Sequence, residues 1–165
     1  MSLQRHLSKD LILYKNLLFP SQFVKVSTLR YSCVVGIGGN IGDVCRRFNH
    51  LIFALKRFVG VDVMQSSVIV KNPPFGFTEQ KDFYNAVLEL RTSMQAHHFL
   101  NFLLRLEKRF GRKRSFANAP RTLDLDIIFF DNRVIDTEKL SVPHPHWRER
   151  ESVVIPLLSL HVKRS

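Results

Sequence analysis

The sequence predicts an α+β protein of the ferredoxin-like type, in which helices pack on a mainly antiparallel sheet. The first observation is the order of periodic segments along the chain, which runs strand, helix, strand, strand, helix, strand. The second is the composition, because 45% hydrophobic and 24% charged residues are typical of a globular protein. The third is the length of 165 residues, which suits one domain with a sizeable core.

The first half of this pattern contains three strands and one helix. The apolar segment SCVVGIGG, residues 32–39, predicts a strand that runs into a glycine turn. Asp43 is placed to cap a helix that ends at Gly60 and has the apolar face Val44, Phe48, Leu51, Leu55 and Phe58. Two further strands and the long loop between them are predicted at 61–70, 84–91 and 71–82.

The second half contains the other helix and the last main strand. Thr92 and Gln95 predict a capping box for a helix that ends at Gly111 and carries Phe99, Leu103, Leu106 and Phe110. A loop and a strand follow at 111–120 and 120–130, and then a turn at Asp131-Asn132, the short segments RVID and LSVPH, and an apolar stretch at 153–160. We expect the helices to lie on one face of the sheet.

Residues 1–30 are predicted to form an N-terminal extension to a single domain at 31–165. Leu11, Tyr14 and Leu18 have helical spacing, so a short helix is expected over 8–19, before Pro20. No apolar stretch approaches the roughly 20 residues of a membrane span. The two cysteines, Cys33 and Cys45, have no metal-binding or redox spacing and are expected to be reduced core thiols of a cytoplasmic protein.

The charge balance favours a polyanionic partner. The 25 Lys and Arg residues against 14 Asp and Glu residues give a formal net charge of +11. Nucleic acid, an acidic membrane and a phosphate-rich small molecule all fit such a charge. Charge alone does not choose among them.

An apolar strand that carries two aspartates gives a sharper signal. In PRTLDLDIIFF, residues 120–130, Asp124 and Asp126 share one face of the strand because side chains alternate, while Leu123, Leu125 and Ile127 take the other. Two like charges beside a hydrophobic run are costly unless a cation lies between them. Exposure on an open sheet face is the plain structural alternative.

The residues before this strand supply cations. The run RLEKRFGRKR, residues 105–114, contains six Lys or Arg residues, and Arg121 follows. A helix C-terminus explains Lys108 or Arg109, but it explains the loop cations Arg112, Lys113 and Arg114 less well. Carboxylates that hold a divalent metal, next to a mobile basic loop, are the components of a nucleoside triphosphate site.

Five segments together carry a resemblance to a known family: GIGGNIGD, NPPFGFTEQKDFYNAV, LEKRFGRKR, PRTLDLDIIFFDN and LSVPHPHWRER. From about residue 32 to 160 the chain resembles the 6-hydroxymethyl-7,8-dihydropterin pyrophosphokinases of folate biosynthesis. The resemblance implies transfer of pyrophosphate from ATP, as co-substrate, to the hydroxymethyl group of the pterin, with release of AMP. It implies no nucleic-acid or membrane partner.

The resemblance also implies a set of nucleotide-site residues. Asp124 and Asp126 are expected to hold two Mg²⁺ ions, and with Arg112 and Arg121 they form the expected catalytic set. The expected ATP-binding residues are Glu107, Arg112, Arg114, Arg121, Ile127, Lys139, Ser141, His144 and Arg150. The pterin hydroxyl would attack the β-phosphorus in line, and no residue stands out as a general base. For Glu107, pairing with neighbouring cations is the alternative, and for His144 a metal site with His146.

The pterin site implied by the resemblance consists of Asn72, Pro73, Phe75, Phe83 and Asn85. Phe83 would stack on the ring, although it also fits a core position at the end of a strand, and the two prolines also fit a plain rigid loop. The chain departs from the family at the second stacking aromatic, which aligns with Ser152, and Trp147 is a candidate substitute. The basic loop lacks the family's tryptophan.

Two other classes of function stay open at this point. A basic ferredoxin-like domain fits an RNA-binding module, and PFGFTE faintly resembles the aromatic motif that such modules carry on a central strand. Pro73 and Pro74 argue against that strand, because proline cannot donate to the ladder. A catalytically inactive relative that binds a partner is the other alternative. The turn GIGGNIGD lacks the spacing of a dinucleotide or P-loop motif, and we expect a structural role for it near the substrate.

Overall fold

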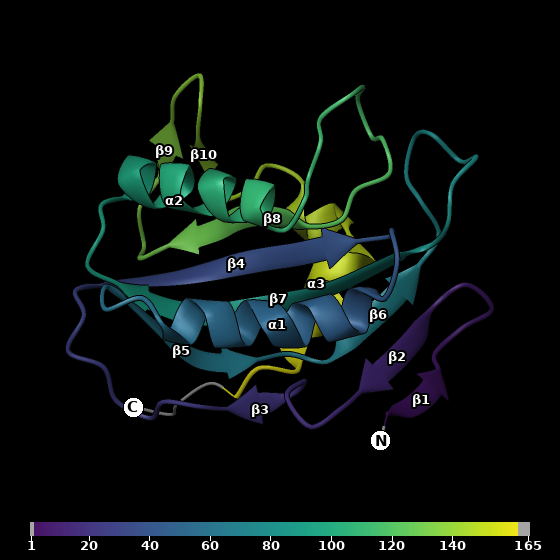
Figure 1. Ribbon diagram of the computed structural model, residues 1–165, viewed down its shortest axis with the longest axis horizontal. Helices are drawn as coiled ribbons and strands as arrows, with labels where there is room; N and C mark the ends of the chain where they lie inside the picture. Colours follow the sequence, from purple (N-terminus) through teal and green to yellow (C-terminus); the bar gives the residue numbers. More distant parts are fainter. Residues whose placement is uncertain (1, 162–165) are drawn as a thin grey trace.

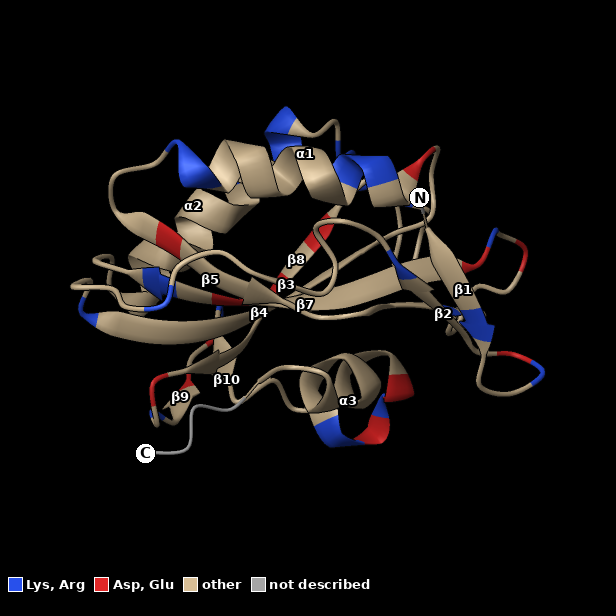
Figure 2. Ribbon diagram, turned by 90° about the horizontal axis from the view of Figure 1, so that it is seen from below, with Lys and Arg blue, Asp and Glu red and all other residues tan. Residues whose placement is uncertain are grey.

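The computed structural model describes residues 2–161. Helices pack on both faces of one large sheet. The centre of the sheet is β4 (Tyr31–Gly39), which pairs with β7 (Phe83–Thr92) on one side and β8 (Asp124–Phe130) on the other, both antiparallel. Figures 1 and 2 show α1 (Val44–Lys56) and α2 (Ala96–Arg109) on one face and α3 (Glu151–Leu158) on the other. The predicted α+β class and antiparallel sheet are confirmed, but the expectation that all helices share one face is wrong.

The third helix explains this difference. The apolar stretch at 153–160 forms most of α3, which packs on β6 and β7 from the side that α1 and α2 leave open. Pro156 lies inside this short helix and is buried against the sheet. Apolar side chains on both faces of the central strands require cover on both faces, so the last helix completes a three-layer arrangement.

The predicted strand over 61–70 is divided into β5 (Val61–Ser66) and β6 (Ile69–Asn72), which pair with different parts of β7. At the break, the Ser67 hydroxyl accepts a hydrogen bond from the Val87 amide at 2.8 Å, and the Ser67 amide donates to the Val87 carbonyl at 3.0 Å. A side chain thus replaces one backbone partner of the ladder, which lets the edge of the sheet bend.

The expected helix over 8–19 is wrong. β1 (Leu3–His6) and β2 (Ile12–Lys15) form a hairpin whose second strand pairs with β6, and β3 (Ser21–Gln22) pairs with β5. Pairing to an open sheet edge outweighs the weak tendency of a short segment to form a helix alone. The same segment places Phe19 in the core, fully buried, with its ring centroid 5.8 Å from that of Phe48.

The predictions hold at the start of α1 and after α2, but α1 ends at Lys56, before the expected Gly60, and the cap of α2 also differs. Asp43 caps α1, since its side chain accepts a hydrogen bond from the Arg46 amide at 3.0 Å. The capping box of α2 is wrong: Thr92 is still part of β7, and its hydroxyl bonds the Met94 amide and the Gly60 carbonyl instead. After α2, Gly111 has φ +83°, the left-handed conformation that glycine adopts most easily.

The segments between β8 and α3 form short elements. β9 (Ile135–Asp136) and β10 (Ser141–Val142) form a small hairpin, and a single 3₁₀ turn, η1 (Trp147–Glu149), leads into α3. Cys33 and Cys45 are both free thiols, but only Cys33 lies in the core, since Cys45 is half-buried at its edge. Among the described residues, none of the helices has the length and apolar character needed to cross a bilayer.

Candidate active site

The two aspartates of β8 share a face of the sheet, as the alternation predicts. In the register with β4, Asp124 lies opposite Gly38 and Asp126 opposite Gly36, while Leu125 and Ile127 point into the core. The glycines keep this face clear: a side chain at Gly38 would begin 2.6 Å from the Asn85 amide oxygen. The glycine pattern of β4 therefore leaves room for polar side chains from the neighbouring strands.

Residues from four elements line a small cavity of about 60 Å³ on this face. β8 contributes the two aspartates and β7 contributes Asn85, and the segments before and within α3 contribute His144, Arg150 and Ser152. The fold thus brings together six polar side chains that are as much as 67 residues apart in the sequence. The cavity is smaller than the roughly 300 Å³ at which ligand pockets begin, so a substrate needs neighbouring side chains to move.

Two arginines pair with Asp124, and their charge offsets the repulsion between the two neighbouring carboxylates. The guanidinium of Arg112 pairs with Oδ1 of Asp124, and Nη1 of Arg121 lies 3.2 Å from Oδ2. Asp126 has neither a hydrogen bond nor an ion pair with any side chain among residues 2–161. The strand therefore presents one neutralised and one unpartnered carboxylate to the cavity.

Glu107 connects α2 to this site. Its side chain is 3% exposed, and it pairs with Arg112 at 3.1 Å and with Arg114 at 3.3 Å. Its Oε1 also accepts a hydrogen bond from the Leu125 amide at 2.9 Å. The pairing with neighbouring cations, which was the structural alternative for Glu107, is thus present.

Burial and like charges shift the acid–base properties of the site. Burial, and then the negative charges of Asp124 and Glu107, raise the pKa of Asp126 to about 7. Burial and the adjacent Arg150 lower the pKa of His144, which favours a neutral imidazole. A cation that enters the cavity would therefore stabilise the ionised form of Asp126.

The donor set fits Mg²⁺ that is shared with a substrate. Two carboxylates face the same cavity, and Mg²⁺ is commonly held by one or two carboxylates with phosphates and water as its other ligands. Within the described part of the chain, no group of three or more His, Cys, Asp or Glu side chains is placed to hold a metal. His146 pairs with Glu149 at 3.2 Å, so the alternative metal site in HPH gains no support.

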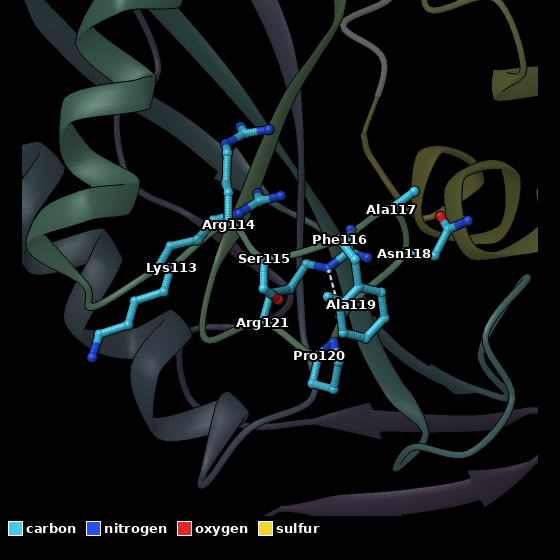
Figure 3. A pocket seen from close by; sticks show the side chains of 10 residues that line it. Lys113, Arg114, Ser115, Phe116, Ala117, Asn118, Ala119, Pro120 and Arg121 are labelled. Atoms are coloured by element: carbon cyan, nitrogen blue, oxygen red, sulfur yellow. Dashed lines mark hydrogen bonds between the residues drawn. The ribbon is translucent and has the colours of Figure 1, made fainter.

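The basic loop, residues 111–120, lies beside the aspartates and surrounds a second cavity of about 320 Å³. Figure 3 shows the side chains that line this cavity, which come from the continuous segment 112–121. The dashed line joins Nε of Arg121 to the Ala119 carbonyl, 3.0 Å away. Arg114 is two-thirds exposed, whereas Arg112 is nearly buried. The loop therefore holds one arginine on the carboxylates and presents another to solvent.

Three of the predicted pterin residues lie together where the end of β6 pairs with the start of β7. Asn85 donates a hydrogen bond to the Asn72 side chain at 2.6 Å, and Asn72 donates in turn to the Pro73 carbonyl at 3.0 Å. Phe83 is half-buried, with the Arg121 guanidinium 5.1 Å from its ring centroid. Phe75 is 56% exposed in the loop after β6, so PFGFTE lies on a loop and not on a central strand.

Other predicted residues lie outside the cavity. Lys139 and Ser141 are exposed on the β9–β10 hairpin, and the Ile127 side chain is in the core, which leaves only its backbone near the sheet surface. Trp147, the candidate substitute for the missing aromatic, packs edge-on against Phe129, 5.0 Å between centroids, and does not line the cavity. The position of the missing aromatic is therefore occupied only by buried Ser152.

Sequence reasoning missed the residue that joins the two loops. Asn40, directly after β4, is 4% exposed, and its side chain bonds both the loop after β6 and the backbone of Arg121. A polar residue at the end of a buried strand, in GIGGN, is the only signal of it in the sequence. The sequence predicts a structural role for the glycine turn, and Asn40 lies within it.

Taken together, carboxylates on a sheet face, arginines on a neighbouring loop and an amide pair define a nucleotide-dependent phosphoryl-transferring enzyme. Residues 34–162 match the model of the 7,8-dihydro-6-hydroxymethylpterin-pyrophosphokinase family. The chain belongs to this family.

Individual relatives match most of this chain, and the bacterial enzymes are matched over most of their own length as well. The chain is 41% identical to the 2-amino-4-hydroxy-6-hydroxymethyldihydropteridine pyrophosphokinase of Helicobacter pylori, over 84% of this chain and 86% of that protein. The enzyme of the same name from Campylobacter jejuni is 38% identical over 87% and 91%. The mitochondrial folate synthesis bifunctional protein of Arabidopsis thaliana is 33% identical over 85% of this chain but only 25% of that protein.

Proposed function

We propose that the chain transfers pyrophosphate from ATP to 6-hydroxymethyl-7,8-dihydropterin, giving the pterin diphosphate and AMP in folate biosynthesis. The observation that carries the proposal is the Asp124–Asp126 face of β8, with Arg112 and Arg121 bound to Asp124 and the Asn72–Asn85 amide pair beside it. Membership of the family supports the choice of substrates. ATP use and two free thiols support a cytoplasmic location.

The aspartates would hold two Mg²⁺ ions together with the triphosphate of ATP. Asp126 has no protein partner among the described residues, and Asp124 has only arginines, which phosphate oxygens can attract away. Bound Mg²⁺ would neutralise phosphate oxygens and orient the β-phosphorus. Arg112, Arg114 and Arg121 would then bind the triphosphate, so that the protein acts by positioning and charge stabilisation and not by a general base.

The pterin would bind against the amide pair and Phe83. Amide groups of Asn72 and Asn85 offer both donors and acceptors, as the edge of a pterin ring requires. Phe83 offers a ring face that is already covered by the cationic Arg121. Substrate stacking would displace this guanidinium toward the phosphates, where its charge is needed.

The experiment is an endpoint nucleotide analysis with ATP, Mg²⁺ and the pterin, beside a reaction without pterin. AMP that appears only with pterin supports pyrophosphate transfer, whereas ADP would indicate an ordinary kinase or ATPase. Asp126→Asn should abolish AMP release, and the exposed Asp136→Asn is the matched control that should retain it. Wild-type turnover by Asp126→Asn at saturating Mg²⁺ would contradict the metal assignment.

A further inference from the structure

We infer that Gln80 and Asn40 are positioning residues that join the pterin loop, residues 73–82, to the basic loop, residues 111–120. This inference rests on the proposed function for the identity of the two substrates. It concerns residues that contact neither the aspartates nor the cavity beside them. Through this link, the conformation of the pterin loop would determine the positions of the basic loop and of Arg121, which directly follows it.

Asn40 uses all its side-chain hydrogen-bonding atoms between the pterin loop and Arg121, the residue directly after the basic loop. Its Nδ2 donates to Oε1 of Gln80 at 2.9 Å and to the Lys81 carbonyl at 2.9 Å, both in the pterin loop. Its Oδ1 accepts from the Arg121 amide at 3.0 Å, and its own amide donates to the Arg121 carbonyl at 3.0 Å. A buried amide with every partner satisfied fixes the distance between the segments that it bonds.

Gln80 connects the pterin loop to a second point of the basic loop, at Asn118. Its Nε2 donates to the Asn118 carbonyl at 2.9 Å, and also to the Phe77 carbonyl within its own loop at 2.6 Å. A continuous series of amides therefore runs from Arg121 through Asn40 and Gln80 to Asn118. It bonds both ends of the segment 118–121 to one glutamine and one asparagine.

Close packing accompanies these hydrogen bonds. The rings of Phe77 and Phe116 meet edge to face, 5.3 Å between centroids, with Phe77 37% and Phe116 57% exposed. A side chain at Gly76 would begin 2.7 Å from Nδ2 of Asn118, so the Asn118 side chain lies directly against the backbone of the pterin loop there. This ring pair adds an aromatic contact to the hydrogen bonds that join the two loops.

The link acts on the site through Arg121. This residue carries the backbone bonds to Asn40, and its guanidinium contacts Asp124 and covers the Phe83 ring. A pterin that orders its own loop would therefore also restrict the arginine that faces the phosphates. The coupling free energy between the two substrates should depend on the link.

The test compares Gln80→Ala with Gln95→Ala, since Gln95 is exposed at the start of α2 and its side chain makes no capping bond. Hydrogen exchange of the free protein is measured first. Gln80→Ala should speed exchange in residues 112–120, outside the loop that carries the substitution, whereas Gln95→Ala should not. Unchanged exchange in the basic loop of Gln80→Ala would overturn the inference, whatever the activity of the protein.

Binding supplies the second readout. The affinity of the pterin is measured with and without Mg²⁺ and the non-hydrolysable α,β-methylene analogue of ATP. In the wild type the analogue should tighten pterin binding by at least about 5-fold, and Gln80→Ala should reduce this ratio toward one. Gln80→Glu, which keeps the acceptor for Asn40 but loses the donor to Asn118, should behave like Gln80→Ala.

The outcomes separate the two proposals. A wild type that neither binds pterin nor releases AMP would contradict the proposed function, and the exchange result would still decide whether the loops are linked. A wild type that shows coupling, with the same ratio in Gln80→Ala, would overturn the inference and leave the proposed function intact. A merely structural role for Gln80 would lower the melting temperature without changing the ratio.

Discussion

The Glu107 carboxylate accepts a hydrogen bond from the Leu125 amide, 2.9 Å away, and Leu125 is the residue between the two aspartates. The same carboxylate pairs with Arg112, which in turn pairs with Asp124. One buried side chain of α2 therefore fixes both the backbone of β8 and the arginine that neutralises it. The carboxylates of the site depend on this contact for their position.

Replacing Glu107 tests this dependence. Glu107→Ala should lower the free energy of unfolding by about 3 kcal/mol, because it leaves a buried amide and a nearly buried guanidinium without their partner. Glu107→Gln keeps an acceptor for Leu125 and should cost clearly less. Urea unfolding of both variants measures the difference, and equal losses would contradict a role for the Leu125 bond.

The raised pKa of Asp126 predicts a stability that depends on pH in the metal-free protein. Below about pH 4 the carboxyl is protonated in both the folded and the unfolded state, so it contributes no difference. As pH rises from there through about 7, the unfolded state loses this proton more readily, and stability falls. Asp126→Asn should therefore stabilise the metal-free protein by roughly 1 to 3 kcal/mol at about pH 8, and by little at about pH 4.

Mg²⁺ should counter the destabilising effect of the ionised Asp126 carboxylate. Added Mg²⁺ should raise the melting temperature of the wild type at about pH 8, because it stabilises the ionised carboxylate, and should have less effect on Asp126→Asn. Thermal unfolding with and without Mg²⁺ measures both. An equal increase for the two proteins would place the metal elsewhere.

The central fold could be predicted because its signals are local. The apolar strand at residues 32–39 and the Asp43 cap depend on neighbouring residues, and both are confirmed. The helix expected over 8–19 was wrong because the edge of β6 lies far along the sequence and offers a strand partner that no local pattern reveals. The position of α3 on the second face depends likewise on the apolar surface that the folded sheet presents.

The site could be predicted in part for the same reason. Asp124 and Asp126 were recognisable from two-residue spacing on an apolar strand, and the fold places them together. The link through Asn40 and Gln80 was not recognisable, because it joins residues 40 apart in sequence by side-chain amides that have no periodic pattern. Sequence also gave Trp147 a substitute role, whereas the turn before α3 directs it toward Phe129.

Gly39 should tolerate no side chain. An added Cβ would lie 2.6 Å from the Thr122 carbonyl oxygen, which belongs to the backbone and cannot turn aside. Gly39→Ala should cost about 1 to 3 kcal/mol in the free energy of unfolding. Gly36→Ala is the matched comparison, since the nearest atom to its Cβ would be the flexible end of Ile128 at 3.2 Å, and the nearest backbone atom would be 3.9 Å away. An equal cost for both would contradict the backbone contact.

The N-terminal segment should contribute to stability through Phe19. Phe19→Ala removes a fully buried ring that packs on Phe48 and should cost about 3 to 5 kcal/mol. Leu17→Ala, at a residue that is 88% exposed, should cost less than about 0.5 kcal/mol. Chemical unfolding measures both, and a small loss for Phe19→Ala would mean that this segment is not part of the core.

Arg121 should require a guanidinium and not merely a positive charge. Its Nε donates to the Ala119 carbonyl at 3.0 Å while its Nη1 contacts Asp124 at 3.2 Å, and its plane covers Phe83. An ammonium group cannot make both bonds and stack at once, so Arg121→Lys should reduce kcat by about 10²-fold with little change in melting temperature. The exposed Arg105→Lys is the control and should retain wild-type turnover. If Arg121→Lys kept its kcat and lost only affinity for ATP, the residue would bind the ground state and the transition state equally, and its place beside Asp124 would serve nucleotide capture instead of transfer.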